Sequence, residues 1–392
     1  MAFVIIGDTF TFPEGDAATN RVYTYSKGFL ENGLKIHIVC FGSEYNSAGD
    51  GILDGIYYYH PFGIRARSKY FIIRRWNRVI RYFKTAALVA GINKNDKIIV
   101  FHCYTSLLRT QLFAFILSRY FKAKLILERS EHPMRNYNDK FLKRIYGKLK
   151  VALEIKFCDG IFCISNFLIN FYKSRGFDQR KLFLIPSTVD TGRFNDHFDS
   201  PFSFKYILYC GSLTVIKDGV DILIESYSKI AGKYADINLV LVGEADSEKD
   251  EIFFRDLVTK CGMNQRVFFT GKLPRKTIPA YLTNAEILTL ARPRSIVADA
   301  GFPSKVTEYL ATGKPVVVTK VGDIPLYLKD NENAFLSEPD SVDAFAEKLD
   351  YVLGNYELAK LAGEKGRMLT ATVFNYNFQG KRVIEFIKNS FS

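Results

Sequence analysis

The sequence has no apolar run that approaches the ~20 residues needed for a membrane-spanning helix. Its first residues, MAFVIIGDTF, lead directly into a strand without a basic segment, so we expect no signal peptide. The six cysteines show no spacing typical of metal ligands, and Cys40 and Cys163 stand in apolar runs. We therefore expect reduced thiols in a cytoplasmic protein.

Several catalytic signatures are also missing. The chain contains no Walker loop, no H-E-x-x-H motif and no Ser/His/Asp order, and no D-x-D-type metal pair is evident. The loop around Gly15 does not spell G-x-G-x-x-G, which argues against a dinucleotide fingerprint. We predict that the protein uses no metal and no cofactor.

Acidic residues are scarce in the first half of the chain. Residues 51–150 hold 21 basic but only 5 acidic side chains, whereas residues 201–392 hold 24 of each. The whole net charge of +13 therefore belongs to residues 1–200. A basic surface of this kind favours phosphate: an anionic membrane surface, nucleic acid or a phosphorylated substrate.

What is present indicates two domains. The length of 392 residues exceeds one ordinary core, and 48% of the residues are hydrophobic. Residues 3–6, 21–32 and 34–41 are typical of a strand, a helix and a strand, which form a βαβ unit of a doubly wound sheet. Further strands are predicted in both halves, and the polar segment 195–204 is the predicted linker. These further strands span 97–101, 124–127, 160–164, 183–186, 206–209, 237–242, 267–270, 287–291 and 315–318.

Candidate binding residues follow the predicted strands, because doubly wound sheets place ligands beyond the carboxyl ends of their strands. In the first half, the loop with Gly15 and Asp16 either lets a ligand approach the backbone or is a tight loop without a ligand. His132 is a site candidate in the loop after strand 124–127, Arg129 stands in the same loop, and His102 is weaker, since a lone histidine is more often structural. In the second half, the strand ends gather Gly211, Lys217, Gly243, Gly271 and Arg292 at one edge.

A basic amphipathic helix is predicted within residues 65–84, RARSKYFIIRRWNRVIRYFK. Its apolar positions, including Trp76, recur at helical spacing, with Arg74, Arg78 and Arg81 on a neighbouring face. Such a helix can lie in an anionic membrane interface. The alternative is a domain helix whose apolar face packs on the sheet and whose arginines are solvated. Residues 140–150 are basic as well and would extend the same surface.

The segment 299–319, DAGFPSKVTEYLATGKPVVVT, combines a turn, a helix and a buried strand. Pro303 suits the first helical position, so the amides of Ser304, Lys305 and Val306 are unpaired donors that form an anion site. Glu308 lies one turn further, where its carboxylate could bind a pair of hydroxyls such as a ribose diol. An ordinary amphipathic helix between a turn and a strand is the alternative.

The chain resembles the retaining glycosyltransferases of the GT-B fold, family 4 (group 1). The resemblance covers nearly the whole chain and rests on GSLTVIKDGVDILIESY, LVLVGEA, FFTGKLP, GFPSKVTEYLATGKPVVVT, CDGIFCIS, LFLIPSTVDTGRF and FNYNFQGKRVIEFI. It implies two Rossmann-like domains facing a central cleft. The first, acceptor-binding domain would span residues 1–196 and the nucleotide-sugar domain residues 202–373, with a helix at 374–392 crossing back to the first domain.

The resemblance also implies roles for individual residues. Glu308 would hold the donor ribose and Lys217 the diphosphate, and His132 would lie near the transferred sugar. The remaining donor-binding positions are the strand-end residues Gly211, Ser212 and Gly243, the base loop Gly271, Lys272 and Leu273, and the turn residues Gly301, Phe302, Pro303, Ser304, Lys305 and Val306. Gly15, Asp16, His102 and Arg129 would lie on the acceptor side.

Two positions depart from the family pattern. The first Glu of its E-x7-E motif would fall at position 300, where this chain has Ala300, and the arginine five residues before Lys217 is Ser212. Asp299 is our candidate for the missing carboxylate. Arg292 and Lys305 are our candidates for the missing positive charge.

The resulting expectation is a metal-independent hexosyltransferase that retains anomeric configuration and extends a lipid-linked or growing polysaccharide acceptor. Same-face attack, in which the departing phosphate takes the acceptor proton, is implied by the family. The basic first half would hold the enzyme on the cytoplasmic face of an anionic membrane. The alternatives are a nucleotide-sugar epimerase of the same fold, a catalytically degenerate member, and a protein that only binds membrane or nucleic acid.

Overall fold

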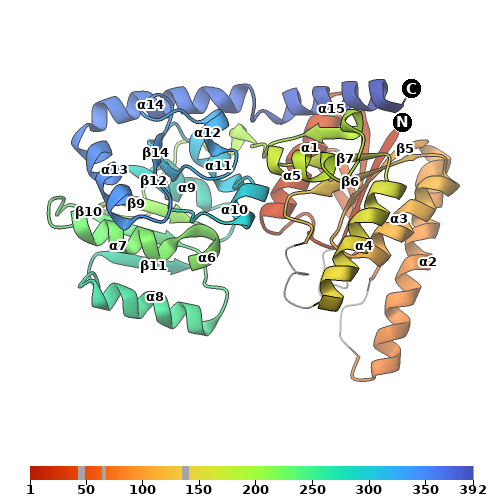
Figure 1. The fold of residues 1–392 in the computed structure, drawn as a ribbon, viewed down its shortest axis with the longest axis horizontal. Coiled ribbons are helices and arrows are strands. Elements are labelled where there is room, and N and C mark those ends of the chain that lie inside the picture. Colours follow the sequence, from red (N-terminus) through yellow and green to blue (C-terminus); the bar gives the residue numbers. More distant parts are fainter. Residues whose placement is uncertain (43–48, 64–67, 135–140, 392) are drawn as a thin grey trace. The chain divides into compact units, whose positions relative to one another are not determined.

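The computed structural model describes residues 1–42, 49–63, 68–134 and 141–391. The chain forms two compact units: Met1–Thr188 together with Tyr376–Ser392, and Val189–Asn375 (Figure 1). Each unit is an α/β layer structure with its own central sheet. Among the described residues, no helix is both long enough and apolar enough to cross a bilayer.

The first unit is built on an eight-stranded sheet in the order β3-β4-β2-β1-β5-β6-β7-β8. All neighbouring strands are parallel except the β3–β4 pair. The strands are β1 (Ala2–Gly7), β2 (Lys35–Cys40), β3 (Gly51–Leu53), β4 (Ile56–Tyr59), β5 (Ile98–Tyr104), β6 (Lys124–Arg129), β7 (Gly160–Cys163) and β8 (Leu182–Leu184). The chain starts in the middle of this sheet and winds outward in both directions, as predicted for a doubly wound domain.

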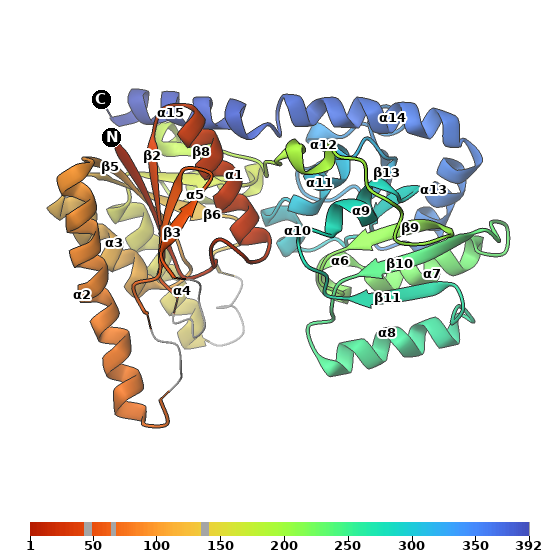
Figure 2. The ribbon, with the colours of Figure 1, turned by 180° about the vertical axis from the view of Figure 1, so that it is seen from behind.

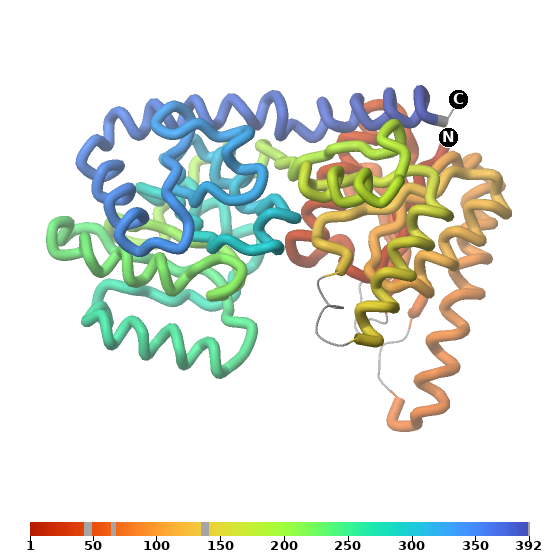
Figure 3. The backbone as a smooth tube through the Cα atoms, in the orientation of Figure 1, coloured from red at the N-terminus to blue at the C-terminus, as the bar shows by residue number. Residues whose placement is uncertain are grey.

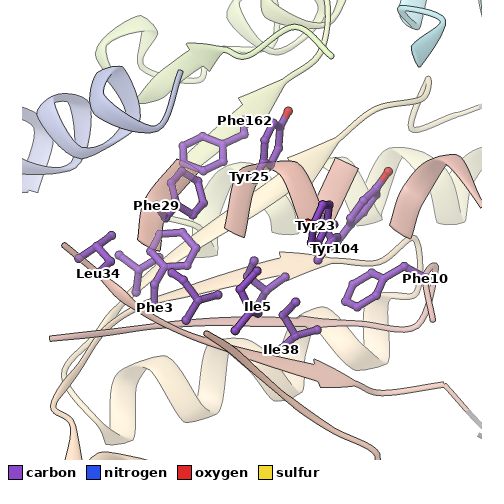
Figure 4. Close-up of a cluster of buried hydrophobic side chains, with 14 of the residues drawn as sticks. Phe3, Ile5, Phe10, Tyr23, Tyr25, Phe29, Leu34, Ile38, Tyr104 and Phe162 are labelled. Atoms are coloured by element: carbon purple, nitrogen blue, oxygen red, sulfur yellow. The ribbon is translucent and has the colours of Figure 1, made fainter. Parts of the chain in front are cut away.

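Helices cover both faces of this sheet. They are α1 (Ala17–Glu31), α2 (Phe71–Asn95), α3 (Leu108–Tyr120), α4 (Phe141–Phe157), α5 (Asn166–Lys173) and α15 (Tyr376–Phe391), with a short 3₁₀ turn, η1 (Gln179–Lys181). The α1 and α15 helices lie side by side although they stand at opposite ends of the sequence (Figures 2 and 3). Their contact needs glycines, because a Cβ at Gly28 would lie 2.2 Å from the Tyr376 carbonyl oxygen. Figure 4 shows the aromatic core between α1 and the sheet, around Phe3, Phe29 and Phe162.

The opposite face carries α2, α3 and α4, which lie next to one another (Figure 1). Tyr82 of α2 packs edge-on against Phe113 of α3, and Phe115 of α3 packs against Phe157 of α4. Only the carboxyl-terminal part of α2 buries side chains, from Arg81 onward. The first three turns of α2 therefore do not pack on the sheet.

The second unit has a six-stranded parallel sheet in the order β11-β10-β9-β12-β13-β14. Its strands are β9 (Lys205–Cys210), β10 (Ile237–Val242), β11 (Val267–Gly271), β12 (Ile287–Leu290), β13 (Val316–Thr319) and β14 (Phe335–Ser337). Its helices are α6 (Val215–Asp218), α7 (Val220–Ile230), α8 (Glu248–Lys260), α9 (Ile278–Thr283), α10 (Ile296–Ala300), α11 (Ser304–Ala311), α12 (Ile324–Tyr327), α13 (Val342–Gly354) and α14 (Tyr356–Met368), with 3₁₀ turns η2 (Thr191–Phe194) and η3 (Leu369–Ala371). The two doubly wound sheets confirm the predicted fold class.

Several boundaries differ from the prediction. The α1 helix starts at Ala17 rather than residue 21, because the Asp16 carboxylate accepts the Ala18 N–H and caps it. The first unit ends at Thr188 rather than 196, and its returning segment begins at Tyr376 rather than 374. The segment 195–204 is not a free linker: Phe204 stacks on Phe268 of the second sheet. Two aromatic residues in a polar segment were sufficient to bind it to the core.

The basic helix also differs from one interpretation of the sequence. Packing of its apolar face on the sheet is wrong for the first turns, since Trp76 is 63% exposed. Arg81, which we placed on the solvated face, is buried and donates to the Phe41 carbonyl oxygen at 2.6 Å. Residues 65–67 and 140 of the predicted basic segments lie outside the described residues.

Candidate functional site

The strand order of the second unit reverses between β9 and β12. Ligands of doubly wound sheets bind beyond the carboxyl ends of the strands at such a point. Gly211 follows β9 here and Arg292 follows β12, and α11 begins after the turn at Gly301 to Pro303. The structure therefore brings most of the predicted residues of the second half to one edge.

A largely buried lysine is the centre of this edge. Lys305 Nζ donates to Asp218 Oδ2 at 2.9 Å and to Tyr209 Oη at 2.8 Å. Gly211 leaves room for the ammonium group, because a Cβ there would lie 2.3 Å from Lys305 Nζ. Burial opposes ionisation of Asp218, but the charges of Lys305 and Arg292 keep the pKa of its carboxyl below its ordinary value. The carboxylate thus stays ionised and holds Lys305 in place.

Glu308 has a partner that the sequence patterns did not single out. Arg193 of η2 donates from Nη1 to Glu308 Oε1 at 2.6 Å, and its Nη2 lies 3.4 Å from the Arg275 carbonyl oxygen. About a fifth of each side chain is exposed, 19% for Arg193 and 21% for Glu308. The guanidinium therefore links the Glu308 carboxylate to the loop after β11. The motif LFLIPSTVDTGRF, which contains Arg193, was the available signal.

The first turn of α11 offers fewer donors than predicted. The Val306 amide is already bonded to the Pro303 carbonyl oxygen at 3.1 Å, and the Gly301 amide to Val297 at 3.2 Å. Within the part of the chain that the structure describes, the amides of Ser304 and Lys305 bond to no other group. These two donors remain for an anion at the positive end of the helix.

The strand-end glycines form one connected rim. The Gly211 amide donates to the Val242 carbonyl oxygen at 2.9 Å, and the Gly243 amide donates to Gly271 at 3.0 Å. A Cβ at Gly243 would lie 1.9 Å from the Gly211 carbonyl oxygen, so no side chain fits between these strand ends. Beyond the rim, three predicted residues line solvent-accessible loop surface: Ser212, Lys272 and Leu273.

The remaining second-unit candidates differ in exposure. Lys217 is exposed next to the buried Asp218. Arg292 is only 4% exposed and donates from Nη2 to the Val297 carbonyl oxygen at 3.1 Å, so its side chain braces α10. Ala300 is fully buried, whereas Asp299 beside it is partly exposed. Asp299 is therefore the carboxylate of α10 that a ligand can reach.

Two acceptor-side candidates of the first unit are core residues instead. His102 is 1% exposed and lies 3.0 Å from Glu128, whose carboxylate also pairs with Arg21 at 2.8 Å. Arg129 is 5% exposed and pairs with Glu154 at 2.7 Å. Both side chains neutralise buried carboxylates, which would otherwise destabilise the core. The prediction that they contact an acceptor is wrong because neither reaches the surface.

The other first-unit candidates lie near the carboxyl edge of their sheet. His132 is 9% exposed, its Nδ1 accepts the Met134 N–H at 3.2 Å, and burial followed by the Arg175 charge lowers its pKa. Asp16 caps α1, and a Cβ at Gly15 would lie 2.1 Å from Thr19 Oγ1. Local structure thus accounts for Gly15 and Asp16, and their contact with an acceptor stays a prediction. Among the described residues, no group of three or more His, Cys, Asp and Glu side chains could hold a metal.

Comparison with known sequences identifies the second unit. Residues 193–368 match the family described as Glycosyl transferases group 1. A phosphatidylinositol N-acetylglucosaminyltransferase of Arabidopsis thaliana is 22% identical over 346 residues, 87% of this chain and 72% of that protein. The GDP-mannose-dependent alpha-(1-6)-phosphatidylinositol monomannoside mannosyltransferase of Mycolicibacterium smegmatis is 24% identical over 213 residues. That match spans 52% of this chain but only 55% of the relative, so it leaves almost half of the relative unmatched.

Solved structures match the whole chain. Sucrose-phosphate synthase from Thermosynechococcus elongatus has a TM-score of 0.75 at 14% identity, covering 100% of this chain and 99% of that one. Anabaena HepE, solved in complex with UDP, has a TM-score of 0.70 at 13% identity, covering 99% and 100%. At such identities these matches show the fold. They confirm the GT-B fold class, and with the family match they confirm the recognition as a GT-B glycosyltransferase of the group 1 type.

Proposed function

Because the chain is a GT-B glycosyltransferase of the group 1 type, we propose that it moves a hexose from a nucleotide-diphosphate sugar to a glycan or lipid-linked acceptor. The observation that carries this proposal is the constellation of Glu308, Lys305 and the first turn of α11 at the switch point of the second sheet. It combines a carboxylate suited to hydroxyl groups with cations and amides suited to phosphate. No other described edge of the second unit offers both.

The donor would span this constellation. Glu308 accepts hydrogen bonds from the two ribose hydroxyls, and Arg193 keeps its carboxylate ionised and oriented. The amides of Ser304 and Lys305 receive the diphosphate at the helix N-terminus, with Lys217 as a mobile cation at the rim. The backbone of Gly271 to Leu273 lies beside the base. Every group in this scheme belongs to the second unit, so donor binding needs no residue of the first.

The family positions that are altered here find replacements in the structure. Lys305 Nζ stands over Gly211, directly before Ser212, which supports Lys305 as the substitute for the missing arginine charge. Arg292 is held in the fold by Val297, so it contributes its charge from behind. Asp299 offers the exposed carboxylate beside Ala300 and would bind sugar hydroxyls. These substitutions change the contacts to the phosphate and the sugar while leaving the ribose carboxylate intact.

The chemistry follows from the charge of the leaving group. A departing nucleoside diphosphate gains negative charge, which a helix N-terminus and fixed cations stabilise without a metal. Retention then follows from attack on the same face as the leaving group, whose phosphate oxygen takes the acceptor proton. The lowered pKa of His132 supports a neutral imidazole near the sugar, which can accept a hydrogen bond from a hydroxyl.

The acceptor class is supported by the relatives. Both the Arabidopsis and the mycobacterial proteins carry phosphatidylinositol in their names, which supports a lipid-linked acceptor. A growing polysaccharide is the second acceptor to test. The base remains to be chosen by experiment, because HepE was solved with UDP while the mycobacterial relative is named for GDP-mannose.

The decisive experiment is thermal unfolding of the purified chain with UDP-, GDP-, ADP- and TDP-sugars. A bound donor stabilises the folded state in proportion to RT ln(1 + [L]/Kd), so one base series should raise Tm. NMR of the product then separates transfer with retention from epimerisation of the free nucleotide sugar. EDTA should leave donor binding unchanged. Absence of stabilisation by any nucleotide sugar would refute the proposal, and binding without turnover would identify a degenerate member.

A further inference from the structure

The helix layer formed by α2, α3 and α4 exposes an unusual amount of apolar surface. On α2, Ile72 is 79% exposed, Trp76 63% and Phe83 71%. On α4, Phe141 is 69% exposed, Leu142 77% and Leu149 52%. Water-soluble surfaces rarely group so many large apolar side chains, and such groups mark interaction sites. We name the exposed faces of residues 71–83 and 141–149 the docking surface.

The charge of this layer has one sign. The helices α2 and α3 contain no acidic residue, and the acid of α4, Glu154, is buried in an ion pair with Arg129. The exposed charges between the apolar side chains are therefore all positive: Arg75, Arg78, Lys84, Lys143, Arg144 and Lys148. Helices that are apolar and exclusively basic on their exposed side fit an anionic bilayer surface.

Helix length explains why the docking surface stands clear of the sheet. The 25 residues of α2 extend ~37 Å at 1.5 Å per residue. The 7 residues of the following strand β5 extend only ~23 Å. Because α2 runs antiparallel to β5, its surplus length projects beyond the carboxyl edge of the sheet, as Figure 1 shows. The amino-terminal turns of α2 consequently bury no side chain in the fold.

The same geometry holds for α4, which starts beyond the carboxyl end of β6. His132 lies in the loop between these two elements, at the same edge. We propose that the docking surface inserts Ile72, Trp76 and Leu142 into the apolar layer of an anionic bilayer. Arginine and lysine side chains then pair with lipid phosphates around the inserted residues. A lipid-linked acceptor would thereby reach the first unit at the edge that carries His132; only the identity of this acceptor rests on the proposed function.

Nucleic acid is a poorer match for this surface. Phosphate backbones are bound by cations and polar groups, and single strands by stacked aromatic rings. Exposed Ile72, Val79 and Leu142 offer neither, whereas all three suit hydrocarbon. The bilayer is therefore the occupant that accounts for both the apolar and the basic residues.

The sole tryptophan of the chain reports directly on insertion. With vesicles of phosphatidylcholine containing phosphatidylglycerol, the emission of Trp76 should shift to the blue and be quenched by brominated acyl chains. Arg75→Gln with Arg78→Gln should weaken vesicle binding roughly 25-fold, about fivefold per arginine. High salt should weaken the wild type in the same way. Pure phosphatidylcholine should bind far more weakly than the anionic mixture.

A matched pair of variants tests the apolar residues. Ile72→Ser with Leu142→Ser should reduce vesicle binding and quenching, with Tm unchanged because both side chains are exposed. The control is Leu358→Ser with Leu361→Ser on α14, where the leucines are 63% and 61% exposed. This control should bind vesicles as the wild type does. Equal losses in both double variants would overturn the proposal.

Other outcomes would reassign the surface. Unchanged Trp76 emission with anionic vesicles overturns insertion, and tight binding to RNA without an emission shift assigns the surface to nucleic acid. Self-association in sedimentation experiments that the Ile72/Leu142 variant abolishes assigns it to a second copy of the chain. Donor binding in the absence of vesicles is measured separately, so failure of docking and failure of the proposed function are distinguishable.

Discussion

Replacing Glu308 by glutamine tests the heart of the donor site. The substitution keeps the shape of the side chain but removes the charge that accepts the ribose hydroxyls and pairs with Arg193 at 2.6 Å. Hydrogen bonds to charged groups contribute about 1.5–3 kcal/mol each, so the Kd for the nucleoside diphosphate should rise ~10–100-fold. The ion pair with Arg193 is only one fifth exposed, which limits screening by solvent.

The assay is isothermal titration with the ribose nucleotide and with its 2′,3′-dideoxy analogue. In the wild type, the analogue should bind ~10–100-fold more weakly, because the carboxylate loses its partners. In Glu308→Gln, the two ligands should bind almost equally, which makes a cycle that isolates the carboxylate–diol contact. The control is Glu251→Gln, which breaks a 2.9 Å ion pair with Arg255 on α8. A full penalty for the analogue in Glu308→Gln would refute the ribose assignment.

Three further perturbations follow from the geometry. Lys305→Met leaves the buried Asp218 without its cation, so the free energy of unfolding in urea should fall by about 3 kcal/mol, and the double variant with Asp218→Asn should recover part of it; a neutral result would contradict the role of the pair. Gly243→Ala pushes a Cβ to 1.9 Å from the Gly211 carbonyl oxygen at a φ of +135°, so Tm should drop by the equivalent of at least ~2 kcal/mol, whereas Gly232→Ala meets nothing within 4 Å and should be silent. The pKa of His132 is lower in the folded chain than its ordinary value of 6.5, so the unfolded chain binds the extra proton and stability should fall as the pH drops below 6.5. His132→Gln should remove that part of the acid-induced loss in a pH series of urea titrations, and an unchanged pH profile would show that the imidazole is not buried in its neutral form.

Much of the fold was readable from local patterns. Alternating apolar segments predicted two parallel sheets, because strands buried on both faces need continuous β-branched or aromatic runs. The glycines after the strands predicted a ligand edge, and the structure gathers Gly211, Gly243 and Gly271 there. Chain ends of elements were less accurate, as Asp16 shows: a capping side chain decides where a helix starts, and its effect is a single hydrogen bond.

What only the tertiary structure decided concerns residues far apart in sequence. Arg193 and Glu308 stand 115 positions apart, and nothing in either neighbourhood announces their ion pair. His102 and Arg129 looked like site residues because they follow strands, but buried carboxylates from other elements claim both. Likewise, the periodicity of residues 71–83 predicted an amphipathic helix, while its exposure depends on α2 being longer than the sheet beneath it. Sequence spacing sets the face of an element on which a side chain lies; packing decides what that face meets, because burial and pairing depend on the whole fold.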